Sequence, residues 1–224
     1  MKENRSNSRR KFIGALAAGS AAGLTALTNP LAAYAEGATT TADGSDEWFK
    51  KSKAKHKIIY DSPEPYNGFA FIWSWVYYLT NNQTGSPDSD VTAMVVLRHE
   101  SIPFAMNNEL WKKYNFGKVF NITDSKTSEP SVRNLYYEPQ DGDFPVPQIQ
   151  GIKDLQGRGA MFCVCDMAIT VYSSMIAQNM NLDPAEVKKE WVAGVLPDIK
   201  VVPSGVWAVG RAQENGFAYC FAGG

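Results

Sequence analysis

Short apolar runs of strand length, separated by longer helix-like stretches, constrain the fold of this chain most strongly. Val91–Leu97 and Met161–Cys165 are near-continuous apolar runs, as in strands that are buried on both faces of a sheet. Further strands are expected at residues 56–60, 198–202 and 217–221. Because helical stretches separate the strands, we expect them to pair in parallel. The sequence therefore predicts an α/β fold, a three-layer α/β/α sandwich around a mostly parallel five-stranded sheet.

The stretches between the strands predict helices. We expect them at residues 69–79, 102–114, 149–157, 168–180, 184–195 and 206–215. Asp183, Pro184 and Glu186 mark the clearest start, since Asp caps a helix, Pro suits its first position and Glu its third. Ser101 is expected to cap the helix over 102–114. The helix over 69–79 is apolar on nearly every side, so we expect it deep in the fold or against another subunit.

The first 35 residues have the features of an export signal. Arg9 and Arg10 precede a weakly apolar run over residues 14–27, and Ala33-Tyr34-Ala35 offers a cleavage site. Consecutive arginines ahead of such a run are typical of the bacterial twin-arginine route. We therefore expect passage through the twin-arginine translocase, cleavage after Ala35, and a periplasmic or otherwise exported mature protein.

The sequence predicts three segments: a signal peptide at residues 1–35, a disordered linker at 36–55 and one domain at 56–224. The expected linker is small and polar and then Lys-rich. The domain is long enough to bury a full hydrophobic core. Within it, residues 121–148 are rich in proline and acids and show no helical or strand period. We expect a loop insertion there, with a functional or assembly role.

The charge balance limits the classes of partner. The whole chain carries 22 Lys and Arg against 23 Asp and Glu. Removal of residues 1–35 takes away five basic groups and one acidic group, which leaves 17 against 22, a balance of about −5. That charge argues against a nucleic-acid partner. No later stretch approaches the roughly 20 residues that span a membrane, so no membrane partner is expected after cleavage.

Cys165 is the first candidate for chemistry. It lies where the expected strand 161–165 leads directly into a helix, at the carboxyl edge at which open α/β sheets bind ligands. A helix N-terminus stabilises a thiolate, so Cys165 is predicted to be a nucleophile or sulfur carrier that is reachable from the crevice. The alternative is an inert buried cysteine. Asp166 would oppose a thiolate if its carboxylate pointed inward.

The other two cysteines, Cys163 and Cys220, are expected to be core residues. Cys163 lies on the same strand face as Cys165, about 6.6 Å away at normal strand rise. That separation is near the upper limit for a disulfide. With three cysteines in the whole chain, the sequence does not predict a disulfide scaffold.

Polar residues follow other strands at the same expected sheet edge. Arg98 and His99 end the second strand, and Asp61 ends the first, so they can bind an anionic substrate or activate the thiol. The backbone amides of Ser204 and Gly205, ahead of a helix, can bind an anion. Each of these residues also has an ordinary alternative as a surface, hydrogen-bonded or capping residue.

No recognised metal or nucleotide motif accompanies these residues. The two histidines, His56 and His99, have no ligand spacing with cysteines or carboxylates. The sequence contains no G-x-G-x-x-G, P-loop, G-x-S-x-G or C-x-x-C motif. The turn after the first strand also lacks the phosphate-binding loop of a flavin nucleotide site. We therefore expect no metal and no cofactor.

Residues 95–104, 162–168, 202–207 and 211–219 together resemble the exported branch of the DsrE/DsrF-like family. The similarity spans residues 56–224, and the loop over 121–150 matches least. The resemblance implies a DsrE-like or flavodoxin-like α/β/α domain that forms a homo-oligomer, a trimer or hexamer, without a cofactor. Sulfur-carrying members hold a persulfide on a cysteine in the turn after the third strand, and Cys165 matches it by position. Asp166 stands where that pattern has Gly or Asn.

Three hypotheses for the function follow. The first is an exported sulfur carrier or sulfurtransferase that holds a persulfide on Cys165, with a donor or acceptor protein or a small sulfur anion as its partner. The second is a noncatalytic oligomeric protein that binds a small anion. The third is a thiol redox partner, which needs a second reachable cysteine.

Overall fold

The computed structural model describes residues 45–223, and within them the chain forms a sheet of five parallel strands in the order β4-β3-β2-β1-β5. The predicted α/β fold is confirmed. The strands are β1 (His56–Ser62), β2 (Val91–Leu97), β3 (Met161–Cys165), β4 (Ile199–Val202) and β5 (Ala218–Phe221). Every residue of the central strand β2 is buried, which explains why its sequence is apolar except for Thr92.

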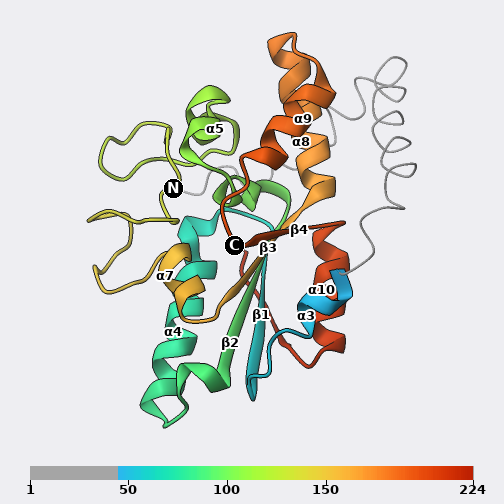
Figure 1. Ribbon diagram of the computed structural model, residues 1–224. Coiled ribbons are helices and arrows are strands. Elements are labelled where there is room, and N and C mark those ends of the chain that lie inside the picture. The colour runs from blue at the N-terminus through green and yellow to red at the C-terminus, as the bar shows by residue number, and fades with distance from the viewer. Residues whose placement is uncertain (1–44, 224) are drawn as a thin grey trace, which may run out of the picture. The chain divides into compact units, whose positions relative to one another are not determined.

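Helices connect the strands and cover both faces of the sheet (Figure 1). The described α-helices are α3 (Ser45–Phe49), α4 (Phe69–Gln83), α5 (Asn108–Lys113), α6 (Phe116–Val119), α7 (Ile152–Gly157), α8 (Asp166–Met180), α9 (Pro184–Ala193) and α10 (Gly205–Glu214). Three short 3-10 helices, η2 (Tyr66–Gly68), η3 (Asp88–Asp90) and η4 (His99–Ala105), complete the connections. None of the helices within residues 45–223 is long and apolar enough to cross a membrane.

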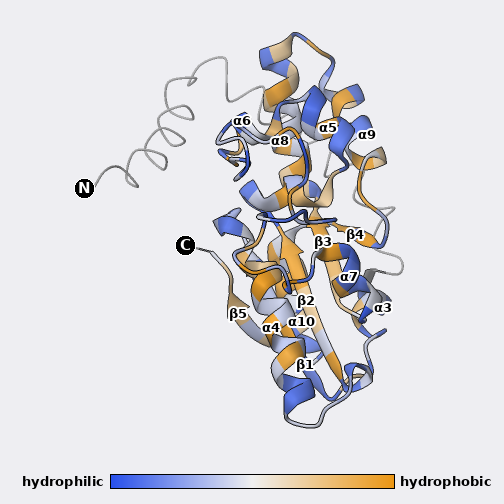
Figure 2. Cartoon of the chain, turned by 90° about the vertical axis from the view of Figure 1, so that its left-hand side faces the viewer, coloured by the Kyte–Doolittle hydropathy of each residue, from blue (hydrophilic) through white to orange (hydrophobic). Residues whose placement is uncertain are grey.

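Two apolar cores lie on opposite faces of the sheet, as expected for three layers. The larger core contains Phe71 of α4, alternate strand residues such as Val95 and Phe162, and the inner sides of α8 and α9. The smaller core contains Met94, Cys163 and the inner side of α10. Figure 2 shows the strands as the most hydrophobic part of the domain, with mixed helices around them. Residues of one strand that differ by two positions therefore face the same helical layer.

The predicted helix over 102–114 is wrong. Residues His99–Ala105 form the 3-10 helix η4, which contains Pro103, and α5 begins only at Asn108. Asn107, not Ser101, caps α5, since its side chain accepts a hydrogen bond from the backbone N–H of Leu110. The break lies at Met106 and Asn107, whose backbones are extended. Met106 forms an antiparallel bridge with Val195 there, a contact between distant parts of the chain. Phe104, Leu110 and Trp111 are nevertheless buried, as the apolar pattern predicts.

The predicted disordered linker over 36–55 is wrong for its described part, while residues 36–44 and the predicted signal peptide 1–35 lie outside the described residues. Ser45–Phe49 forms α3, and Phe49 is 1% exposed. The Phe49 ring packs edge-on against Trp207 of α10 at 5.6 Å. The Lys-rich composition of the segment concealed this apolar anchor.

The predicted loop over 121–148 contains no helix or strand, but it is packed against the domain. Arg133 lies at its centre and pairs with Asp124 at 3.0 Å and with Asp143 at 2.6 Å. The amide of Asn134 donates to the backbone carbonyls of Phe104 and Met106. These charged and polar contacts replace the backbone ladder that regular structure would supply.

Helix α4 covers β1 and β2 with only one of its sides. Ala70, Phe71, Ser74 and Tyr78 are its buried residues, whereas Val76 is 37% exposed. The expectation of a helix buried deep in the single domain is therefore wrong, and its outer side is covered incompletely. Coverage by another subunit stays a prediction.

Candidate functional site

The junction of β3 and α8 has the local geometry that the sequence predicts. Cys165 is the last residue of β3 and the N-cap of α8, which begins at Asp166. Its Sγ accepts a hydrogen bond from the backbone N–H of Ala168 at 3.3 Å. A helix N-terminus and an amide donor both favour the anionic form of a sulfur atom. The position of the thiol beside the first amides of the helix is therefore confirmed.

The expectation that Cys165 is open to solvent is wrong for the single chain. The residue is 6% exposed. It pairs in register with Val202 of β4, and the turn after β4 closes over the edge, where Pro203 O accepts a hydrogen bond from Met167 N at 3.3 Å. Little of Cys165 is therefore exposed at this edge of the sheet.

The Asp166 carboxylate points to a cation and not to the thiol of Cys165. Its carboxylate pairs with Lys188 of α9, with 2.9 Å between Oδ2 and Nζ. This ion pair joins α8 to α9 and compensates the negative charge next to Cys165.

Arg98, Asp61 and Cys165 lie on the same face of the sheet, the face covered by α10. Val96 pairs in register with Cys163, so Arg98 and Cys165 follow at matching positions two residues later. The pKa of the Arg98 guanidinium is raised above its usual value, mainly by hydrogen bonds to Asp61 and in smaller part by the charges of Tyr219 and Cys165. The register thus places Arg98 and Cys165 side by side at the ends of neighbouring strands, while the guanidinium itself is bound to Asp61 of β1.

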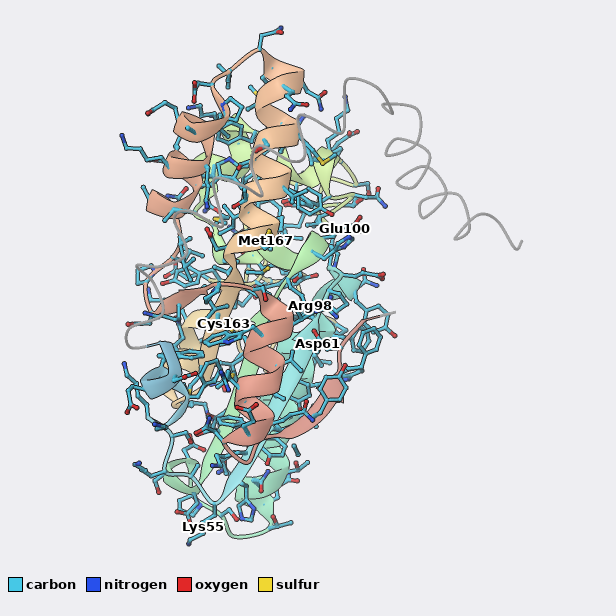
Figure 3. All side chains as sticks on the ribbon, turned by 90° about the vertical axis from the view of Figure 1, so that its right-hand side faces the viewer. Lys55, Asp61, Arg98, Glu100, Cys163 and Met167 are labelled. Atoms are coloured by element: carbon cyan, nitrogen blue, oxygen red, sulfur yellow. The ribbon has the colours of Figure 1, made fainter. Side chains whose placement is uncertain are left out.

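Arg98 is held by two hydrogen bonds to one carboxylate. Its Nε donates to Asp61 Oδ1 at 2.6 Å and its Nη2 donates to Asp61 Oδ2 at 3.0 Å. The Tyr219 hydroxyl donates a further hydrogen bond to Asp61 Oδ2 at 3.0 Å. Figure 3 shows Asp61 and Arg98 close together beside α10, with Lys55 at the far end of the domain. A carboxylate so occupied repels an anion, so Asp61 fits a supporting role better than the substrate-binding role that we expected.

Sequence reasoning missed Tyr219. It lies on the edge strand β5, where it pairs in register with Ile59, two residues before Asp61. Nothing in the sequence places β5 next to β1, because the two strands are far apart in the chain. The available signal was its polar hydroxyl in an otherwise apolar strand.

His99 contacts a different part of the molecule from Arg98. Its backbone has a positive φ of 53°, and its ring packs edge-on against Tyr172 of α8 at 5.8 Å. The His99 Nε2 and the Tyr172 hydroxyl oxygen are 3.4 Å apart. Tyr172 packs against the core on the α4 side of the sheet, whereas Arg98 contacts α10. The structure does not place His99 in the row formed by Cys165, Arg98 and Asp61.

Ser204 and Gly205 shape the turn that covers this row. Ser204 caps α10, since its Oγ accepts a hydrogen bond from Trp207 N at 3.3 Å. A Cβ atom on Gly205 would lie 2.6 Å from the Cβ of Arg98, so only glycine allows the helix to approach the arginine stem this closely. These roles are structural, and anion binding by the turn stays a prediction.

The three cysteines are free thiols in very different surroundings. Cys163 is fully buried in the α10-side core, and burial raises the pKa of its thiol far above the usual value. Cys220 is partly exposed on β5, and β2 and β1 separate that strand from β3. Cys163 is sealed from solvent and Cys220 lies on a distant strand, so neither is an adjacent partner of Cys165; the thiol redox hypothesis stays a prediction.

A hollow of about 680 Å³ lies elsewhere, between α5 and α9. Asn107, Lys113, Glu190 and Gly194 are among the residues that line it. Lys113 and Glu190 pair across it at 2.7 Å. None of the site residues expected from the sequence lines this hollow, so it gives no support to chemistry at Cys165.

The described residues form no metal site, and comparison with known proteins identifies no family. Among residues 45–223, no group of three or more His, Cys, Asp or Glu side chains is placed to hold a metal ion. No family model matches the chain, and no match is found among curated proteins. The geometry of the site therefore carries the functional argument alone.

Proposed function

We propose that this protein is an exported sulfur carrier of the DsrE/DsrF-like type, in which Cys165 holds a persulfide. The observation that carries the proposal is the Sγ of Cys165 at the N-terminus of α8, where the Ala168 amide donates to it at 3.3 Å. Two further features support it: Arg98 lies next to Cys165 in the strand register, and Lys188 pairs with Asp166.

The proposed reaction is a transfer of sulfane sulfur without net oxidation. The Cys165 thiolate attacks the terminal sulfur of a polysulfide, a new S–S bond forms, and the donor S–S bond breaks. The shortened polysulfide leaves with the electron pair of that bond, and the protein retains Cys165 as a persulfide anion. Sulfite then takes the outer sulfur, leaves as thiosulfate, and regenerates the thiolate.

The low exposure of Cys165 restricts the proposed donor. At 6% exposure, Cys165 offers too little surface for the active-site thiol of a folded protein, so a small inorganic sulfane species suits it better. We therefore propose a small sulfur anion as the immediate partner. Burial also limits contact between the persulfide and bulk reductants.

The same low exposure favours a second candidate, a noncatalytic protein that binds a small anion near Arg98. In that case, the anion still stabilises the Cys165→Ala variant against unfolding. The proposed homo-oligomer, a trimer or hexamer, agrees with either function, since α4 leaves Val76 37% exposed. A monomeric protein in analytical ultracentrifugation would contradict the proposed assembly.

Intact mass spectrometry after exposure to inorganic polysulfide tests the sulfur-carrier proposal. The wild type is expected to gain the mass of one sulfur atom and to lose it on addition of sulfite, with release of thiosulfate. Cys220→Ser is the matched control, since Cys220 is more exposed than Cys165 but lies outside the site. Cys165→Ser is expected not to gain the mass. An equal gain in Cys165→Ser would overturn the proposal.

A further inference from the structure

Asp61 is almost fully buried, and its carboxylate accepts hydrogen bonds from side chains of two other parts of the sheet. The residue is 4% exposed. Arg98 of the β2 end binds both carboxylate oxygens, at 2.6 Å and 3.0 Å. Tyr219 of β5 donates its hydroxyl to Oδ2 at 3.0 Å. A buried carboxylate requires such donors, because removal from water is costly for an unpaired charge.

Tyr219 is otherwise an unusual residue for this position. It lies on an edge strand and is 46% exposed, yet its hydroxyl is directed to the buried Asp61. Its ring therefore does little to fill the core. The contact that the structure assigns to it is the hydrogen bond to the carboxylate that holds Arg98.

We propose that Tyr219 is a positioning residue, which acts through Asp61 to hold the guanidinium of Arg98, the residue next to Cys165 in the strand register. The inference rests on the proposed function, in which the reactivity of Cys165 is used. The hydroxyl shares the negative charge of Asp61, so that less of the Arg98 charge is compensated and more of it acts on the sulfur. Gly205 belongs to the same arrangement, since its missing side chain lets α10 lie close to the side chain of Arg98.

The charges oppose one another, so two substitutions have opposite expected effects on the sulfur. In Tyr219→Phe the Asp61 carboxylate loses a hydrogen-bond donor and compensates more of the Arg98 positive charge. Cys165 is then expected to be less reactive at neutral pH. Asp61→Asn keeps a side-chain oxygen that accepts a hydrogen bond from Arg98 but removes the competing negative charge, and so makes Cys165 more reactive. In the Asp61→Asn background, Tyr219→Phe has no further effect, because the charge through which the hydroxyl acts is gone.

The test is alkylation of Cys165 by iodoacetamide over a pH series, located by fragment-ion mass spectrometry and normalised to the rate at the high-pH plateau. Normalisation separates ionisation of the thiol from access to it. Tyr219→Phe is expected to lower the normalised rate at pH 7 about threefold, the size of a modest coupling within one network. Tyr137→Phe is the matched control. Tyr137 lies in the loop that follows α6, and among its neighbours is Lys153 of α7.

Two outcomes overturn the inference: an unchanged profile in Tyr219→Phe, or an equal loss in the single variant and in the Asp61→Asn background. Neither outcome bears on persulfide formation, which the polysulfide experiment measures separately. Conversely, a profile that moves as expected in a protein that takes up no sulfur supports the positioning role and refutes the sulfur carrier.

Discussion

Gly205→Ala is expected to destabilise the protein although it places a better helix former in α10. A Cβ at position 205 would lie 2.6 Å from Cβ and 2.8 Å from Cδ of Arg98. Contacts this short require the backbone or the arginine stem to move. Overpacking of this kind costs about 1–3 kcal/mol. Alanine regains at most about 1 kcal/mol of helix propensity, so we expect a net loss of about 1 kcal/mol.

Gly210→Ala is the matched control in the same helix. Nothing lies within 4 Å of a Cβ built at that position, so this substitution is expected to stabilise the protein by about 0.5–1 kcal/mol. Urea unfolding followed by circular dichroism measures both variants. Opposite signs are expected, with a slower alkylation of Cys165 at neutral pH in Gly205→Ala only. Equal stabilisation by the two substitutions would refute the close approach of Gly205 to Arg98.

Three further predictions concern the stability of the domain, each read from urea unfolding. Phe49→Ala is expected to cost about 3 kcal/mol, since the ring is 1% exposed against Trp207; a variant as stable as wild type would show that α3 does not anchor the segment. Asp183→Ala is expected to cost about 1 kcal/mol through loss of the cap on α9, and no loss would contradict the cap. Burial alone would raise the pKa of Asp143, but hydrogen bonds from Arg133 and from the Gln140 amide lower it below 3.8. The stability that this carboxylate contributes is therefore present above that pH and is lost as the pH falls through the lowered value, so Asp143→Asn is expected to be less stable at pH 7 and to lose less on acidification. An unaltered pH dependence would contradict the partly buried ion pair of Asp143 with Arg133.

Local signals predicted the parts of the fold that depend on neighbours in sequence. The apolar run Val91–Leu97 gave a strand with the observed bounds, and Asp183 caps α9 as its sequence indicates. The predicted helix over 102–114 is interrupted at Met106 and Asn107, and the bridge from Met106 to the distant Val195 is not visible in the sequence. The prediction of a disordered linker failed at Phe49 for a different reason. The burial of Phe49 depends on Trp207, which is far away in the chain.

The candidate site was predictable in position but not in detail. Parallel pairing places Arg98, Asp61 and Cys165 at one sheet edge, and this follows from the strand pattern alone. The hydrogen bond from Tyr219 depends on the pairing of β5 with β1, which the sequence does not specify. The low exposure of Cys165 depends on the turn after β4, whose path is likewise set by tertiary packing.

The central claim is that Cys165 carries sulfur. Its most direct test is intact mass spectrometry, without reducing agent, of the protein isolated from the compartment in which it matures, followed by fragment-ion location of any added mass. The account predicts one additional sulfur atom, located on Cys165 and removed by sulfite. A bare thiol at Cys165, both as isolated and after exposure to polysulfide, would contradict it.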